Sequence, residues 1–195
     1  MLTDDASWLK RFTRRLFTVG LIVGLGLLPV RVSAANAAML EYKVKAGYLF
    51  NFAKFIEWPA QSLPLPNSPF VIGVLDNGDA FALLQSLLEG KMVDGHPLEV
   101  RRVEANALDS DLHILLVTRS AEQSPHAIRA ALGKSATLVV GETEKFAERG
   151  GMLGFVREKE VIRINLNLEQ TAAVGLKVSS KLATVAMVVR GNAGN

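Results

Sequence analysis

The chain has 195 residues, no cysteine and a formal net charge of +3 at pH 7. Its length suggests one domain with short additions, and the lack of cysteine excludes disulfides, thiol chemistry and cysteine-ligated metals. Residues 1–34 hold five of the 22 basic and two of the 19 acidic residues, so the remainder carries 17 of each and is neutral. Without a basic excess to follow a phosphate backbone, nucleic acid is excluded as an expected partner.

Residues 1–37 predict a cleaved export signal. An apolar run at 16–28, about 13 residues long, is shorter than the ~20 that a membrane-spanning helix needs, and small residues at 32–34 or 35–37 suit cleavage. Residues 13–17 resemble a twin-arginine motif, although basic pairs also occur in ordinary signals, so both export routes stay open. The basic region before the run comprises Lys10, Arg11, Arg14 and Arg15. We predict an exported protein with no membrane span after cleavage; an uncleaved anchor is the alternative.

Residues 41–59 hold six of the thirteen aromatic residues and predict a helix that ends at Pro59. Its polar positions, with Gly47 between them, recur at helical spacing on one stripe: Lys43, Asn51, Lys54 and Glu57. Outside this stripe only Glu41 and Lys45 are polar, and their spacing of four lets them pair. A helix that is apolar over most of its surface needs cover on two sides. We expect self-association through Tyr42, Tyr48, Phe52 and Trp58; a plain core helix is the alternative.

Strand and helix patterns alternate along the rest of the chain. Apolar runs predict strands at 70–75, 98–103, 112–118 and 137–140. Helices are predicted after Asp79, from Ser124 to Leu132, and briefly at 144–148. A hairpin (152–156 and 161–168), a long final helix (169–190) and a disordered tail (191–195) follow. This order predicts an α/β fold with a mostly parallel sheet flanked by helices, a C-terminal β-hairpin and a long final helix.

No sequence motif indicates catalysis. The chain lacks a P-loop, a G-x-S-x-G elbow and an H-E-x-x-H motif. Its three histidines are scattered, and His113, inside an apolar strand, is best interpreted as a core histidine rather than a metal ligand. Asp76 is explained by a turn and a helix cap. We therefore expect no enzyme activity, no metal and no cofactor.

Several segments together resemble one known family. The pattern Y-x-V-K-A-x-Y-L-x-N-F-x-K-F-x-x-W-P at 42–59 and GLKVSSKL at 175–182 are its most specific parts. Between them lie HIL at 113–115, LVVG at 138–141 and GGM at 150–152. Residues 40–189 are on these grounds similar to the YfiR-like periplasmic proteins, and we expect residues 38–190 to form a YfiR-like domain.

The resemblance implies a role. Well-known members repress a membrane-bound diguanylate cyclase of the YfiN type by binding its periplasmic sensor domain, which keeps cyclic di-GMP and biofilm matrix production low. They tend to form dimers. The resemblance therefore implies a non-catalytic regulator that forms a homodimer and binds the periplasmic domain of a membrane cyclase or a sensor kinase. Such a repressor acts by binding the inactive form of its partner more tightly than the active one.

Two departures from the family concern regulation and partner binding. Redox-controlled members use paired cysteines, which this chain lacks. Where repressors carry an acidic residue two positions before a characteristic asparagine, this chain has Asn165. The predicted partner surface comprises Met152, Phe155, Asn165, Asn167 and Thr171, with local packing as the alternative for each. The alternative function is small-ligand binding at the strand ends near Asp76, Thr118 and Glu142.

Overall fold

The computed structural model describes residues 34–191 except 64, 66, 110 and 122. The predicted export signal lies outside the described residues apart from its last four, and so does nearly all of the predicted tail. The chain divides into residues 1–36 and residues 37–195, and the fold described below is that of the second unit. Among the described residues, no helix combines the length and the hydropathy needed to cross a bilayer.

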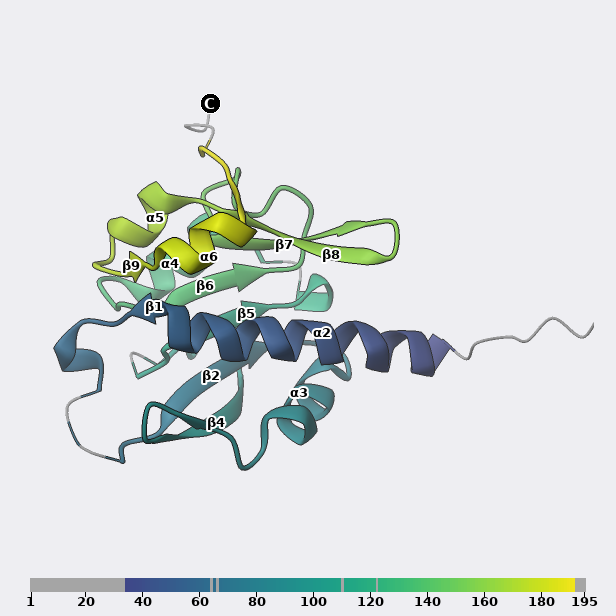
Figure 1. Cartoon of the computed structure of the whole chain (residues 1–195), viewed down its shortest axis with the longest axis horizontal. Helices are drawn as coiled ribbons and strands as arrows, with labels where there is room; N and C mark the ends of the chain where they lie inside the picture. The colour runs from purple at the N-terminus through teal and green to yellow at the C-terminus, as the bar shows by residue number, and fades with distance from the viewer. Residues whose placement is uncertain (1–33, 64, 66, 110, 122, 192–195) are drawn as a thin grey trace, which may run out of the picture. The chain divides into compact units, whose positions relative to one another are not determined.

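An eight-stranded sheet forms the centre of this unit, in the order β10-β8-β7-β6-β5-β2-β4-β3 (Figure 1). The strands are β2 (Phe70–Leu75), β3 (Met92–Val93), β4 (His96–Val103), β5 (Ile114–Val117), β6 (Leu138–Gly141), β7 (Leu153–Glu158), β8 (Val161–Leu166) and β10 (Met187–Val188). Neighbours from β4 to β7 run parallel, the predicted hairpin β7–β8 and the pair β3–β4 are antiparallel, and β10 lies parallel to β8. The predicted α/β fold with a mostly parallel sheet is confirmed.

The central strands β2, β5 and β6 are buried at every residue, as expected for apolar runs covered on both faces. Their order also creates a switch point, because the chain passes from β2 to β4 on one side and then returns to β5 on the other. The carboxyl ends of β2 and β5 are therefore adjacent and are followed by connections that diverge. In doubly wound sheets this is the place where ligands bind.

The first described helix, α2 (Ala34–Phe55), lies across the sheet (Figure 1). Ala46, Leu49, Phe52 and Ala53 are buried in the core. The helical positions of the predicted polar stripe, from Lys43 to Lys54, are exposed as expected. The helix ends four residues before Pro59, because Ile56–Glu57 form a short strand, β1, that pairs with β9 (Lys177–Val178).

The helices α3 (Ala80–Leu88) and α4 (Pro125–Leu132) occur where they were predicted. Ser124 caps α4, since its Oγ accepts the N–H of Ala127 at 3.2 Å, and Pro125 occupies the first turn. The short helix predicted at 144–148 is wrong, because this segment is a turn in which Lys145 has φ +56°.

The long final helix is also wrong. Two short helices, α5 (Leu168–Ala172) and α6 (Ser180–Val185), flank β9, and β10 follows them. Gly175, at φ +80°, ends the helical path, and the Ser179 hydroxyl starts a new helix by accepting the N–H of Leu182. The segment thereby adds strands to two sheets, which a continuous helix would prevent.

Candidate functional site

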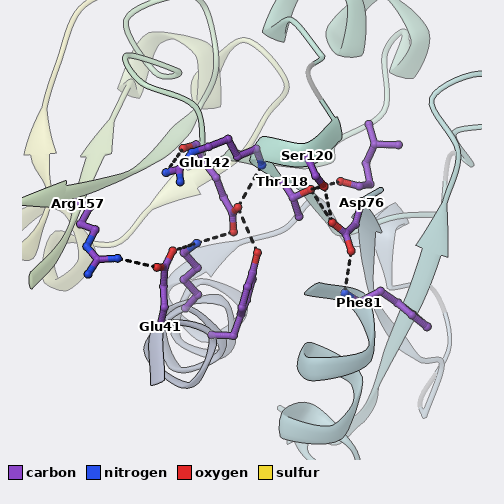
Figure 2. A network of polar contacts seen from close by, with 11 residues as sticks. Glu41, Asp76, Phe81, Thr118, Ser120, Glu142 and Arg157 are labelled. Atoms are coloured by element: carbon purple, nitrogen blue, oxygen red, sulfur yellow. Dashed lines mark hydrogen bonds and ion pairs between the residues drawn. The ribbon is translucent and has the colours of Figure 1, made fainter. Parts of the chain in front are cut away.

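Three polar residues directly follow the buried strands at the switch point: Asp76 after β2, Thr118 after β5 and Glu142 after β6. Figure 2 shows the network that they form with α2 and the hairpin. Asp76 Oδ1 accepts hydrogen bonds from the hydroxyls of Thr118 at 2.9 Å and Ser120 at 2.7 Å. Its Oδ2 accepts the N–H of Phe81 at 3.3 Å, so this carboxylate joins β2, β5 and the start of α3.

Glu142 is 4% exposed and lies against a buried lysine of α2. Its Oε1 is 2.8 Å from Lys45 Nζ, and its Oε2 accepts the N–H of Arg119 at 3.2 Å and the hydroxyl of Tyr42 at 3.4 Å. Lys45 Nζ also lies 2.5 Å from Glu41, as the spacing predicted. One buried cation therefore joins two carboxylates and fixes α2 to the end of β6.

The network continues to the hairpin. Arg157, on β7, donates from Nη1 to the second oxygen of Glu41 at 3.1 Å. The ring of Tyr42 lies 4.6 Å from Lys45 Nζ, in the range of a cation–π contact. The charges of Glu41, Lys45, Glu142 and Arg157 thus compensate one another, as buried charges require.

The pKa shifts in this network do not resemble those of catalytic acids. Burial acts to raise the pKa of Asp76, but the hydrogen bonds from Ser120, Thr118 and the Phe81 N–H outweigh it, and the pKa lies below its usual value. For Glu41, the Lys45 hydrogen bond and the charges of Lys45 and Arg157 likewise overcome burial and lower the pKa. Burial and the Glu142 charge raise the pKa of Tyr42. A general acid needs a carboxyl pKa raised toward neutrality, so the shifts on Asp76 and Glu41 favour a structural role.

A cavity of about 480 Å³ opens beside this network. Its lining includes Asp76, Thr118 and Glu142, the three residues that the sequence suggested for a ligand pocket. Ala38, Ala80 and Leu83 add an apolar part. Its size lies within the range of small-molecule sites. The described part of the chain contains no group of three or more acidic or histidine side chains suited to a metal ion.

The predicted partner residues lie beneath the surface. Their exposed fractions are 2% for Met152, 5% for Phe155, 9% for Asn165, 0% for Asn167 and 1% for Thr171. Each contacts its own protein; for example, the Asn167 amide donates to Ala147 O, and its oxygen caps α5 at Gln170. In this conformation these side chains support a surface rather than form it, and their role in partner binding stays a prediction.

The predicted self-association residues are also packed into the unit. Phe52 is fully buried, and its ring lies 6.1 Å from Tyr48 and 6.0 Å from Phe155. Tyr42, Tyr48 and Trp58 are partly buried against the core. A role in self-association stays a prediction for these residues. Because Phe52 is fully buried, it could affect an interface only through the residues that pack on it.

Sequence reasoning missed the pairing of Lys45 with Glu142, which lies 97 residues away. Two signals pointed to it. Within residues 41–59, Lys45 is the one polar residue besides Glu41 outside the exposed stripe, and Glu142 directly follows a strand of buried apolar residues. A buried charge needs a partner of opposite sign, so two oppositely charged residues at buried positions are expected to pair.

The strand order, the switch point and the network at the strand ends define a doubly wound α/β protein. The chain belongs to the YfiR/HmsC-like family, whose model matches residues 42–187. The predicted family resemblance is confirmed.

A solved structure, of a conserved domain protein from Vibrio cholerae O1 biovar El Tor str. N16961, is similar to the chain with a TM-score of 0.47 and 14% sequence identity. The similarity covers 75% of this chain and 59% of that one. No curated protein sequence matches the chain. Family membership supports a periplasmic regulatory role in cyclic di-GMP signalling.

Proposed function

We propose that this chain is a non-catalytic periplasmic regulator that binds the sensor domain of a membrane-bound diguanylate cyclase, or of a related sensor kinase, and represses it. The observation that carries the proposal is the family match over residues 42–187. The site geometry agrees with it, because the carboxylates of this network are paired or hydrogen-bonded within the protein, and the pKa values of Asp76 and Glu41 are lowered. To repress its partner, the chain must bind the inactive form of that partner more tightly than the active form.

The edge of the sheet at β10 is the surface that we propose for the partner. Met187 pairs in register with Asn165 and Val188 with Leu166, so β10 lies directly beside the strand of the predicted patch. Three apolar side chains at this edge are strongly exposed: Val185 at 68%, Met187 at 55% and Val188 at 51%. Exposed apolar residues beside a strand edge commonly mark a protein interface.

A carboxylate also lies at this edge. The Asn165 amide donates to Glu148 Oε1 at 2.8 Å, and Glu148 Oε2 has no hydrogen-bond partner among the described residues. Glu148 thus places an acidic group next to the position at which the resembling repressors carry one. The proposed partner surface, called the β10 edge, consists of the exposed residues Val185, Met187 and Val188, and the partly buried Glu148 lies beside Asn165.

Met187→Asp should weaken binding to the periplasmic domain of the membrane cyclase encoded nearest to this chain by about tenfold or more. A charge at a desolvated apolar contact costs at least ~1.4 kcal/mol, which corresponds to a factor of ten. The full-length variant and wild type would be compared by co-purification and by a direct affinity measurement.

Met92→Asp is the matched control, because Met92 is 51% exposed on the strand at the opposite edge of the sheet. This control should bind like wild type. Equal binding by both variants would reject the β10 edge as the partner surface. No binding by the wild type to any cyclase or kinase domain would reject the regulator function itself.

The cavity at the strand ends supports a second candidate function, the binding of a small ligand. A ligand at 100 times its Kd would stabilise the protein by about 2.7 kcal/mol, which a thermal-shift screen detects. Ala38→Trp places a large ring at the exposed rim of the cavity and should abolish any such shift. A shift that persists in this variant would place the ligand elsewhere.

A further inference from the structure

His113 immediately precedes β5 and is 5% exposed. Its Nδ1 lies 3.1 Å from the backbone N–H of Val71, which can only donate, so Nδ1 is the acceptor. Its Nε2 lies 2.9 Å from the carbonyl oxygen of Ser62, which can only accept, so Nε2 carries the proton. One neutral tautomer satisfies both contacts, and no other protonation state does.

The imidazole ring also joins separate parts of the chain through its faces. It stacks on Phe70 with centroids 4.5 Å apart and meets Trp58 edge-on at 5.9 Å. Ser62 ends the short helix η1 (Ala60–Ser62), which follows Trp58 and Pro59. His113 therefore holds η1 and Trp58 against the amino ends of β2 and β5.

We propose that His113 is an acid-sensitive latch, closed when the ring is neutral and opened when Nδ1 is protonated. Protonation points an N–H of the ring at the N–H of Val71, so the 3.1 Å contact turns from a hydrogen bond into a repulsion. The ring must then turn or leave, and the hydrogen bond to Ser62 and the packing against Trp58 are lost with it. The proposal does not depend on the identity of any partner.

The charged groups around the ring determine the pH at which His113 is protonated and the latch opens. Burial lowers the pKa of His113 and His96 adds to this effect, while the Ser62 carbonyl and Asp111 raise it; the pKa lies below its usual value of 6.5. Lys134, which lines a cavity of about 430 Å³ beside the ring, is a further cation on this side. Because the folded state takes up the proton at lower pH than the unfolded chain does, stability is complete above pH 6.5 and declines as the pH falls below it.

His96 provides a built-in comparison. Its Nδ1 lies 2.8 Å from the carbonyl oxygen of Ser68, so Nδ1 donates. This hydrogen bond survives when the ring becomes an imidazolium, since both ring nitrogens then donate. Acid should therefore break the contacts of His113 and leave that of His96 in place.

Opening of the latch would also affect the C-terminal part of the chain, through the contacts of Trp58. Trp58 directly follows β1, and β1 pairs with β9, which ends two residues before α6 begins. Release of Trp58 thus loosens the two-stranded sheet that precedes α6 and the β10 edge.

Trp58 is also the reporter for the test. The chain has two tryptophans, so Trp8→Phe in the full chain leaves Trp58 as the only one. We expect its emission to change in a titration from pH 8 to pH 4, with a midpoint below the usual histidine value of 6.5, while far-ultraviolet circular dichroism stays constant. His113→Asn, which keeps an acceptor for Val71 but cannot be protonated, should abolish the change, and His96→Asn should not.

Three results of this titration would overturn the proposal. They are emission that stays constant until the protein unfolds, an emission change that persists in His113→Asn, and an emission change that is lost in His96→Asn. Hydrogen exchange of the unsubstituted chain gives a test that needs no variant. At pH 5 compared with pH 7.5, after correction for intrinsic rates, peptides spanning residues 56–63 should lose protection while those of α4 keep it. Equal protection of residues 56–63 at both pH values would reject the proposal even if His113→Asn failed to fold.

Discussion

Replacing Lys45 with methionine is expected to lower the free energy of unfolding by about 3–5 kcal/mol. Lys45 is 3% exposed and is the cation that neutralises Glu142, itself 4% exposed. Methionine fills similar space but leaves a buried carboxylate without its charge partner, and this uncompensated charge dominates the cost. Urea unfolding of the full chain, followed by circular dichroism, measures the loss.

The double variant Lys45→Met, Glu142→Gln separates charge from packing. The neutral amide can still accept the Arg119 N–H, while the buried charge is gone. We expect the double variant to recover more than half of the stability lost in Lys45→Met, as coupled neighbours do in a double-mutant cycle. A loss below about 1 kcal/mol in Lys45→Met, or no recovery in the double variant, would contradict a buried ion pair at this place.

Gly151→Ala is expected to be the second strongly destabilising change, with a loss of about 3 kcal/mol or more. A Cβ at this position would lie 2.2 Å from the ring of Phe146 and 2.7 Å from its carbonyl oxygen. Phe146 is 1% exposed, so neither its ring nor the backbone can move away without opening the core. Thermal and urea unfolding would report the loss.

Gly47→Ala is the matched control. This glycine lies on the exposed side of α2, and a Cβ there would meet nothing within 4 Å. Alanine should stabilise the helix by about 0.5–1 kcal/mol, because it removes the flexibility of glycine from a helix interior. If both substitutions had the same small effect, the close packing of Phe146 against Gly151 would be wrong.

The parts of the fold that local sequence patterns determine were predictable. β2, β5 and β6 are runs of apolar residues bounded by turns, and α4 carries both its cap and its proline. The C-terminal segment was not, because its apolar residues fall at helical spacing by coincidence. Gly175 breaks the helix there, and the two-residue strands β9 and β10 are selected by partners distant in the sequence.

The candidate site was predictable only in part, for a similar reason. Asp76, Thr118 and Glu142 could be placed at one edge, since the ends of parallel strands meet there. The burial of the predicted partner residues could not be foreseen. Met152 and Asn167 stand next to hairpin strands, and whether such residues face outward depends on β10 and the turn at 144–150, which the sequence does not reveal.

The long-range contacts of α2 have a consequence for the order of folding. This helix is held by Lys45 to Glu142 and by Tyr48 to the Ile162 carbonyl, 97 and 114 residues further along, and its end pairs through β1 with β9. Such contacts close very large loops, and their entropy cost must be met before the helix gains from docking. A helix that is synthesised early therefore packs late, and its aromatic face stays available to chaperones until nearly the whole chain has been made.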